Sequence, residues 1–406
     1  MKILMLCGVF AKENEQEVVR HARAAVEFSA NVFQQKLIAG MHTLGEDFEA
    51  VSAPFVGSYP NASDIVRFRS FEQAQSLCAY VPFNNIWGLR NFSRAHGLKK
   101  AVQDFIRAED EQKVIVVYCP HTPFIEAAVY AKKKDPRIKI CLYVPDLPNF
   151  MNLSAKRSWL YDTAKVYDIA VMTRLMKQVD SFVLLTNQMK DALPVGEKPF
   201  RVIEGIITGP ELEGVPAVKE DDGIIRVVYT GKLNARFGVR HLVDAFCMLP
   251  DPNYRLVLCG RGDCEDYIKE KQTADSRILY QGLVTADVAR DWIRKADVLV
   301  NPRLNDEEYT KYSFPSKNIE YLLSGNPVVA SMLSGMPEDY RRFIYEISPD
   351  VTAAEGICQA LRSAIENKEQ AKQKYEDFCR YARQNLTSES IARTILRLSG
   401  FEMDPT

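Results

Sequence analysis

The chain has 406 residues, more than one ordinary hydrophobic core accommodates, so two domains of roughly 200 residues each are expected. Hydrophobic residues make up 47% and charged residues 26% of the sequence, a balance typical of a folded soluble protein rather than a disordered one. The net charge of −1 argues against a protein that binds nucleic acid through overall basicity, and no apolar run approaches the roughly 18–20 residues of a membrane span.

Short apolar runs alternate with helical segments through the first half of the chain. Helices are expected over 15–40 and 121–134, and apolar runs bounded by polar segments predict strands of a parallel sheet covered on both faces. The expected strands are KILML (2–6), FEAVSA (48–53), KVIVVYC (113–119), IKICLYV (138–144), SFVLLT (181–186) and FRVIEGI (200–206).

The same alternation repeats in the second half, after a segment rich in glycine, proline and acidic residues that has linker composition. We therefore expect an α/β protein with an N-terminal Rossmann-like domain (1–208), a linker (209–223), a C-terminal Rossmann-like domain (224–385) and a final helix and tail (386–406), for which the N-terminal domain is one candidate packing surface. The second series of strands comprises IIRVVYTG (224–231), YRLVLCG (254–260), RILYQG (277–282), DVLVNP (297–302) and PVVAS (327–331).

Nine cysteines occur without a CxxC pair, and several lie in or just after strand-like runs. Buried free thiols in a reducing cytosol explain this pattern better than disulfides or a zinc site. No acidic metal-binding motif stands out either, so we expect neither a metal nor another cofactor, and a cytoplasmic location.

The stretch SFPSKNIEYLLSGNPVVAS (313–331) predicts a helix that leads into a buried strand. Ser316 is placed to cap the helix and Gly325 to end it. Lys317 and Glu320 are three residues apart and share a face near the positive end of the helix. A lysine beside free backbone N–H groups suits a diphosphate, and a glutamate suits the hydroxyl pair of a ribose; the alternative is a surface ion pair on a capped helix.

Two further strand ends of the second domain carry groups compatible with phosphate binding. YTGKLNARFGVRHLVDAF (229–246) places Gly231, Lys232 and Arg236 between a strand and a helix, although a solvated basic loop is the alternative. CGRGD (259–263) supplies Gly260 and Arg261 at the next strand end. Because the carboxyl ends of parallel strands lie at one edge of a sheet, these groups are expected to converge.

These stretches resemble the C-terminal domain of retaining glycosyltransferases of the GT-B fold, family four (group 1), bacterial polysaccharide-assembly type. The resemblance rests on YTGKL, FGVRHLVDAF, LVLCGRGD, ILYQGLV, ADVLVNPR, SFPSKNIEYLLSGNPVVAS and GMPEDY, which follow in the family's order over most of 224–345. KILMLCG, PHTPFIEAA, YVPDLPNFM and VIEGI match more loosely in the first half. The resemblance implies two doubly wound Rossmann-like domains that face a central cleft.

It also implies a nucleotide-diphosphate-sugar donor, UDP- or GDP-linked, bound mainly by the second domain. Carried over one residue at a time, Lys232 and Arg236 contact the diphosphate, Glu320 the ribose, and Ser316 and Lys317 lie near the phosphates. The backbone around Leu283 and Val284 flanks the base, and Gly8 gives the donor room at the first β–α turn. The sequence departs from the family at three places: Tyr312 replaces a glutamate eight residues before Glu320, with Glu307 and Glu308 as substitutes; Phe237 replaces a phosphate-loop lysine, with Arg236 as substitute; and the N-terminal paired-glycine loop is reduced to Gly8.

In the first domain, strand ends carry two residues that are candidates for binding the transferred sugar and the acceptor. His121 in CPHTPF follows the strand KVIVVYC, and a functional histidine lies similarly in the family; it would hydrogen-bond the transferred sugar or assist its departure, with a structural histidine as the alternative. Asp146 in VPDLP orients the acceptor or caps a turn.

Residues 84–108 mix aromatic and basic side chains in a pattern typical of an amphipathic helix. Such a helix lies on an anionic membrane surface or, more commonly, packs on its own sheet. A lipid-linked acceptor would make peripheral membrane contact useful.

Together these features predict a hexosyltransferase that moves a sugar, with retention, from a nucleotide diphosphate to a glycan or lipid-linked hydroxyl during surface polysaccharide synthesis. The alternatives are a nucleotide-sugar 2-epimerase of similar fold and a non-catalytic subunit that binds a nucleotide sugar. No nucleic-acid partner is expected.

Overall fold

The computed structural model describes residues 1–24, 26, 28–72, 77–148, 159–213, 222–305 and 307–401. The described residues form two compact units, each of which is treated by itself. The first unit comprises 1–208 together with 385–406, and the second comprises 209–384. Parts of the stretches discussed above lie outside the described residues: 25 and 27 of the expected helix 15–40, 149–151, 214–221 of the linker segment, and 402–406 of the tail.

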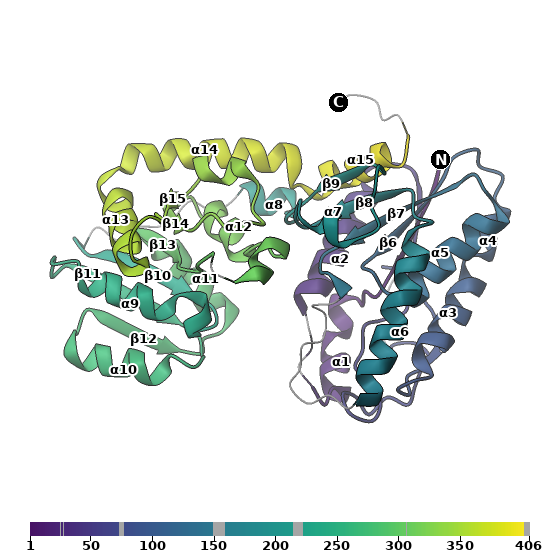
Figure 1. Cartoon of the computed structure of the whole chain (residues 1–406), viewed down its shortest axis with the longest axis horizontal. Helices are drawn as coiled ribbons and strands as arrows, with labels where there is room; N and C mark the ends of the chain where they lie inside the picture. The colour runs from purple at the N-terminus through teal and green to yellow at the C-terminus, as the bar shows by residue number, and fades with distance from the viewer. Residues whose placement is uncertain are drawn as a thin grey trace. The chain divides into compact units, whose positions relative to one another are not determined.

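The first unit is built on a seven-stranded sheet in which every neighbouring pair is parallel (Figure 1). Its strand order is β4-β2-β1-β6-β7-β8-β9, so the order reverses between the neighbours β1 and β6. The strands are β1 (Lys2–Cys7), β2 (Asp47–Ser52), β4 (Ala79–Tyr80), β6 (Lys113–Tyr118), β7 (Ile138–Val144), β8 (Ser181–Leu184) and β9 (Phe200–Val202), and a small separate sheet pairs β3 (Arg67–Phe68) with β5 (Phe83–Asn84).

Helices cover this sheet because alternate side chains of each strand are buried on opposite faces. On one face, Ile3, Met5, Val114 and Val116 form a continuous core with residues of α2 and α15. The helices of the unit are α1 (Glu15–His21), α2 (Phe28–His42), α3 (Arg90–Ala101), α4 (Gln103–Arg107), α5 (Thr122–Lys134), α6 (Trp159–Met176), α7 (Met189–Ala192) and α15 (Ser388–Leu398).

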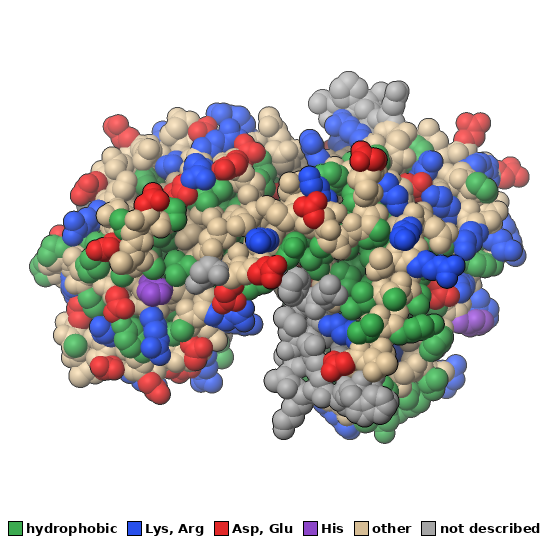
Figure 2. All heavy atoms as spheres, in the orientation of Figure 1, with side chains coloured by type: hydrophobic (Ala, Val, Ile, Leu, Met, Phe, Trp, Pro, Cys, Tyr) green, Lys and Arg blue, Asp and Glu red, His purple; other side chains and the backbone are tan. Residues whose placement is uncertain are grey.

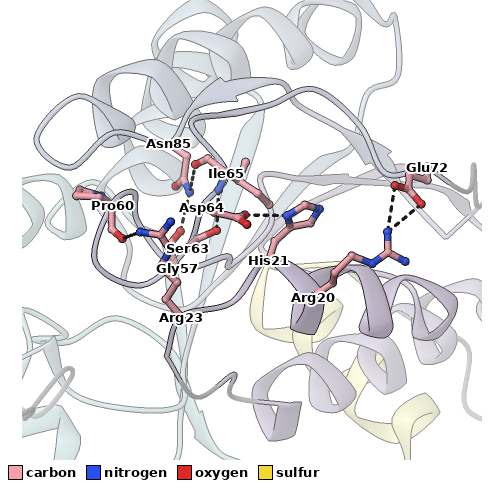
Figure 3. Close-up of polar contacts among 10 residues, drawn as sticks. All are labelled: Arg20, His21, Arg23, Gly57, Pro60, Ser63, Asp64, Ile65, Glu72 and Asn85. Carbon is pink, nitrogen blue, oxygen red and sulfur yellow. Dashed lines mark hydrogen bonds and ion pairs between the residues drawn. The ribbon is translucent and has the colours of Figure 1, made fainter.

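The expected helix over 15–40 is wrong in one respect, because the chain leaves α1 at Ala22 before α2 begins. The backbone of Ala22 is extended and forms an isolated bridge with Ser63. Figure 3 shows the polar contacts that hold this region: Arg23 donates to the carbonyl of Pro60 at 3.0 Å, and His21 Nδ1 lies 2.7 Å from Asp64 Oδ1. The long connection from β2 to α3 is therefore fixed to the end of α1.

The second unit repeats the architecture with a six-stranded parallel sheet in the order β12-β11-β10-β13-β14-β15, which reverses between β10 and β13. The strands are β10 (Ile225–Thr230), β11 (Tyr254–Cys259), β12 (Ile278–Gly282), β13 (Val298–Asn301), β14 (Val328–Ala330) and β15 (Tyr345–Glu346). The helices are α8 (Gly209–Glu213), α9 (Val239–Cys247), α10 (Glu265–Ala274), α11 (Ala286–Lys295), α12 (Ser316–Leu323), α13 (Ala353–Glu366) and α14 (Lys368–Asn385).

The core of the second unit lies between this sheet and the pair α9 and α13. Val227, Leu256 and Val298 from three neighbouring strands pack with Leu242 of α9 and Leu361 of α13, all of them fully buried. The segment expected as a linker contains α8, so part of it is helical. Each of the two doubly wound parallel sheets therefore has one switch point, the place where its strand order reverses.

Candidate functional site

The switch point of the second unit lies where β10 and β13 run side by side and their following loops diverge, the place where open α/β sheets bind ligands. The loop after β10 carries Lys232 and Arg236, and the segment after β13 carries Arg303 and leads through a short 3-10 helix (Glu308–Tyr312) into α12. The sequence predictions at 231–236 and 316–320 thus fall at neighbouring strand ends of one sheet.

Close backbone packing at this edge explains the predicted Gly260 and shows a second required glycine, Gly238. Gly260 has a φ of +143°, and a Cβ there would lie 1.7 Å from the carbonyl oxygen of Gly231. Gly238 has a φ of +79°, and a Cβ there would lie 1.9 Å from the carbonyl oxygen of Pro302. The turn after β10 is therefore held against both neighbouring strand ends, which only glycine permits.

Lys232 is a cation of this edge whose charge is not neutralised by an acidic side chain of the described residues. Its side chain is exposed and contacts no acidic group within the described ranges, while its carbonyl accepts a 3.0 Å hydrogen bond from the hydroxyl of the buried Tyr229. The backbone at Lys232 is therefore fixed and its ammonium group remains available to an anion.

Arg236 belongs to a cluster of side chains that the sequence predicts only in part. Its Nη2 lies 3.1 Å from Glu307 Oε2, and its guanidinium lies 4.8 Å from the ring centre of Tyr309. Arg303 lies over the same ring at 4.6 Å and donates from Nη2 to Ser313 Oγ at 2.9 Å. Its buried Nε has no acceptor within the described part of the chain. The cluster thus adds Arg303 to the predicted cations, together with the aromatic ring of Tyr309, which contacts both arginines.

Arg303 could have been found from the sequence with the rule that selected Lys232. It follows the buried strand DVLVNP directly, so it stands at a strand end of the same sheet. The contact of Arg236 with Glu307 spans 71 positions in the chain and left no local signal. Glu307 was considered only as a substitute for the family's missing glutamate.

Lys317 and Glu320 share a face of α12, as their spacing predicts, and pair with each other through a 2.7 Å contact between Nζ and Oε2. Lys317 Nζ also lies 3.3 Å from Thr230 Oγ1 at the end of β10, which ties the helix to the switch point. The ion pair that was the alternative interpretation is therefore present, and it lies at the same strand ends as Lys232.

The expected cap at Ser316 is wrong. The N-cap of α12 is Pro315, which has no side chain to accept a hydrogen bond, and Ser316 is the first residue of the helix. Its hydroxyl is exposed in the first turn beside free backbone N–H groups. Gly325, with a φ of +78°, directly follows the C-cap Ser324 and ends the helix as predicted.

The remaining donor candidates of the second unit lie at the next strands. Arg261 is exposed after β11, and its carbonyl accepts a 2.8 Å hydrogen bond from the N–H of Leu233. Leu283 and Val284 follow β12, and Leu283 is among the most exposed large apolar side chains described. An exposed leucine at the carboxyl edge is open to stacking against a planar group.

The switch point of the first unit brings Gly8 and His121 together through Phe55. A Cβ at Gly8 would meet the Phe55 ring at 2.5 Å, and that ring lies 5.7 Å from the imidazole of His121 between their centres. Nδ1 of His121 is enclosed and finds no hydrogen-bond partner among the described residues. Burial, with the nearby Arg94 and Arg90, lowers the pKa of His121 and favours the uncharged imidazole.

The backbone that presents His121 is strained, as is common near functional groups. Cys119 has a φ of +64°, which is unusual for a residue with a side chain, and its carbonyl accepts a 2.8 Å hydrogen bond from the N–H of His121. Asp146 follows β7 and is exposed, close enough to Cys119 to help burial raise the pKa of that thiol. Asp146 and His121 therefore stand at adjacent strand ends.

The amphipathic helix expected over 84–108 is shorter and is interrupted. Residues 83–84 belong to a strand, α3 begins at Arg90, and α4 follows after one intervening residue. Arg94 belongs to this basic stretch but is 0% exposed, because its guanidinium turns inward to the carbonyl of Pro54 and the ring of Phe83. Ile86, Trp87, Leu89 and Phe92 are exposed, with Phe92 at 77%.

Charged side chains are otherwise mixed. Figure 2 shows acidic and basic groups interspersed over the visible face of each unit, in keeping with the net charge of −1. Among the described residues, no group of three or more His, Cys, Asp or Glu is arranged to hold a metal ion. In the same part of the chain, no helix combines the length and the apolar character needed to cross a bilayer.

A family model matches the part of the chain that carries these residues. Residues 225–367, about a third of the chain and all within the second unit, match the family model described as glycosyl transferases group 1. No curated protein matches the chain in sequence.

Solved structures of similar fold span nearly the whole chain. The apo form of the lipopolysaccharide outer core galactosyltransferase WaaB is 13% identical, with a TM-score of 0.60 over 99% of both chains. HepE from Anabaena in complex with UDP is 15% identical, with a TM-score of 0.59 over 99% of this chain and 100% of its own. Sucrose-phosphate synthase from Thermosynechococcus elongatus is 15% identical, with a TM-score of 0.58 over 98% of both chains. The fold is that of GT-B glycosyltransferase structures, with two Rossmann-like domains.

Proposed function

We propose that the protein is a glycosyltransferase that binds a nucleotide-diphosphate sugar at the switch point of its second unit. The observation that carries the proposal is the gathering of Lys232, Arg236, Arg303 and Lys317 at adjacent strand ends, in the unit that matches the group 1 family model. Glu307 and Glu320 offset two of these charges, so the edge remains positive where a diphosphate would bind.

Each residue has a distinct part in this proposal. Lys232 and Arg303 contact the diphosphate, Arg236 exchanges Glu307 for a phosphate oxygen, and Lys317 lies with Ser316 at the start of α12. Glu320 accepts hydrogen bonds from the ribose hydroxyls, and the base stacks on the backbone near Leu283 and Val284. Gly231, Gly260 and Arg261 shape the edge, with Gly8 on the first unit beside His121.

The reaction is a displacement in which the bond from the anomeric carbon to the β-phosphate oxygen breaks and a bond to the acceptor oxygen forms. The barrier is mainly charge separation, so fixed cations at the departing diphosphate lower it without a metal. We propose that the departing phosphate oxygen takes the acceptor proton and that the configuration is retained. His121 hydrogen-bonds the transferred sugar, and Asp146 orients the acceptor.

The printed ligands and names of the similar structures support a proposal for the donor and the acceptor. HepE was solved with UDP and with UDP-glucose, and WaaB acts on the lipopolysaccharide outer core. We therefore propose a UDP-hexose donor, with a GDP-hexose as the variant, and a glycan or lipid-linked acceptor of a surface polysaccharide in family four of these enzymes. Nine free cysteines are consistent with the reducing cytoplasm.

Incubation with radiolabelled UDP- and GDP-sugars tests the proposal. Transfer to an acceptor, or slow hydrolysis in its absence, supports it; an isomerised donor indicates an epimerase, and binding without turnover indicates a non-catalytic subunit. Lys232→Ala is expected to weaken binding of free nucleoside diphosphate by about 10- to 100-fold, because a hydrogen bond to a charged group contributes about 1.5–3 kcal/mol. Lys372→Ala, on the exposed face of α14, is the matched control and should leave affinity unchanged.

We further propose that Ile86, Trp87, Leu89 and Phe92 contact the surface of an anionic membrane. These four apolar side chains are exposed on α3 or just before it. The sequence of α3 contains no acidic residue, and its last turn carries the exposed Lys100 and Lys99, which pairs with Glu126 of α5. Apolar side chains beside basic ones fit the interface of an anionic bilayer. This surface replaces the continuous basic helix expected over 84–108.

Phe92→Ser should lower binding to phosphatidylglycerol-containing vesicles by about tenfold, since burying one large apolar side chain is worth about 1.5–3 kcal/mol. Co-sedimentation measures it. Val166→Ser, which removes another exposed apolar side chain on α6, should have no effect. Equal binding of wild type and Phe92→Ser, or equal binding to neutral vesicles, contradicts membrane contact through this surface.

A further inference from the structure

Arg94 is a buried cation that contacts no carboxylate of the described residues. It is 0% exposed, its Nη2 donates to the carbonyl of Pro54, and its guanidinium lies 4.2 Å from the ring centre of Phe83. Its Nε and Nη1 are buried and have no acceptor in the part of the chain that the structure describes. Burying such an arginine lowers the stability of the fold, because its unbonded N–H groups lose their hydrogen bonds to water and gain none in return. A functional role would explain its presence.

The carbonyl that Arg94 holds lies directly before Phe55, the residue that joins Gly8 to His121. Phe55 is fixed on its other sides as well: its N–H donates to the carbonyl of Gly8 at 2.9 Å, and the buried Asn85 donates to the carbonyl of Gly57 at 2.6 Å (Figure 3). The segment 54–57 is therefore clamped at both ends, by a charged group at one end and a neutral amide at the other.

The ring of Phe55 in turn defines the surroundings of His121. It lies 5.7 Å from the imidazole and 5.7 Å from Phe124, and Phe124 lies 5.1 Å from the imidazole, all between ring centres. The three rings form one cluster at the start of α5, where His121 is the N-cap residue. Any shift of 54–55 would therefore move the aromatic wall against which the imidazole rests.

We propose that Arg94 is a positioning residue for His121, acting through the carbonyl of Pro54 and the ring of Phe55. The functional importance of this inference rests on the proposed transfer reaction, in which His121 contacts the sugar. The positioning itself is a property of the first unit and is measurable without substrate.

The charge of Arg94 has a second effect on the same imidazole. The charged and titratable groups around this site are Arg94 and Arg90 from α3, Cys119 after β6, and Asp146 after β7. Burial and the two arginines act in the same direction and lower the pKa of His121, so its uncharged form persists at pH values where an ordinary histidine is protonated. An uncharged imidazole offers one donor and one acceptor to a sugar hydroxyl.

Proton NMR titration of His121 in the unliganded full chain tests the inference, with the resonance assigned by its loss in His121→Gln. Arg94→Met, which keeps the length and removes the charge, should raise the pKa of His121, with burial and Arg90 still opposing protonation. Asn85→Leu releases the other end of 54–57 without changing the charge, and should leave that pKa nearly unmoved. Equal titration of His121 in wild type and Arg94→Met overturns the inference.

Two further variants keep the test decisive if Arg94→Met fails to fold. Arg94→Lys retains the charge but removes the planar guanidinium that reaches the carbonyl of Pro54 over the Phe83 ring, so it should preserve the low pKa of His121 while broadening the Phe55 resonances. Phe55→Leu removes the ring that rests on the imidazole, so it should change the relaxation of the His121 ring resonances while leaving the pKa of His121 low. If both variants titrate and relax like the wild type, Arg94 has no positioning role. The proposed reaction is tested separately by Lys232→Ala. Because Lys232 belongs to the second unit, this variant should lose turnover while the NMR results for His121 stay unchanged.

Discussion

Replacement of Gly260 by alanine is expected to lower the affinity for a nucleoside diphosphate by at least about 100-fold and to destabilise the second unit. A methyl group at this position would lie 1.7 Å from the carbonyl oxygen of Gly231, the residue that precedes Lys232. The backbone cannot retain both that contact and the 2.7 Å hydrogen bond from Gly260 N–H to the carbonyl of Gly282. Strain at a positive φ and a lost hydrogen bond together cost about 3 kcal/mol.

Gly282→Ala is a matched control, because Gly282 also has a positive φ, +68°, but a Cβ there meets nothing within 4 Å. That variant should show only the cost of the left-handed conformation, about 1 kcal/mol, with little change in affinity. Isothermal titration with UDP and GDP, alongside thermal unfolding, separates the two effects. If the two alanine variants behave alike, the approach of Gly260 to Gly231 does not organise the phosphate-binding edge.

Asp135→Asn is expected to destabilise the first unit by about 3 kcal/mol, because it leaves the ammonium group of Lys113 buried without its counter-ion. Lys113 is 0% exposed, and its Nζ lies 2.9 Å from Asp135 Oδ2 and 2.9 Å from the carbonyl of Ile106. The pair ties the start of β6 to the end of α5, the two elements that flank His121. Hydrogen exchange of the amides of β6 and β7 would measure the loss within this unit.

The pH dependence of this contribution has a definite sign. Hydrogen bonds from Arg137, followed by the contact with Lys113, hold the pKa of Asp135 well below its ordinary value. The stabilisation is therefore complete above the ordinary carboxylate pKa of about 4 and is lost as the pH falls below it. The difference between wild type and Asp135→Asn should shrink in acid. Asp104→Asn, at a carboxylate that is 96% exposed, should cost less than about 1 kcal/mol, and an equal loss in both variants would contradict the argument.

The sheets could be predicted from the sequence because a strand buried on both faces reads as an unbroken apolar run. KVIVVYC and IKICLYV are examples, and their strands lie side by side in the first unit. Two-residue strands such as Ala79–Tyr80 and Tyr345–Glu346 carry no such pattern. The break after α1 was missed because it depends on Ala22 pairing with Ser63, a contact that no local periodicity reports.

The candidate site was predictable in part for a similar reason. Parallel strands bring their carboxyl ends together, so Lys232 and Lys317 could be placed at one edge from order alone. The sequence does not show which charges neutralise each other. Arg236 is paired with Glu307, whereas Arg94 contacts no carboxylate of the described residues. Amphipathic periodicity places a cation outside, and only the contacts of Arg94 with Pro54 and Phe83 show that it lies inside.

The first unit is assembled from two distant stretches of chain. Its last helix, α15, packs on α2, and Gly40 permits this contact because a Cβ there would lie 2.1 Å from the carbonyl of Ser388. The backbones of Ile207 and Ser388 are hydrogen-bonded at 2.9 Å, so the chain leaves and re-enters the unit at one place. During synthesis, the second unit therefore emerges whole from the ribosome while the first still lacks the helix that closes its core. A fragment that ends at 208 would expose the apolar side of α2, whereas 209–384 can be excised as a continuous piece.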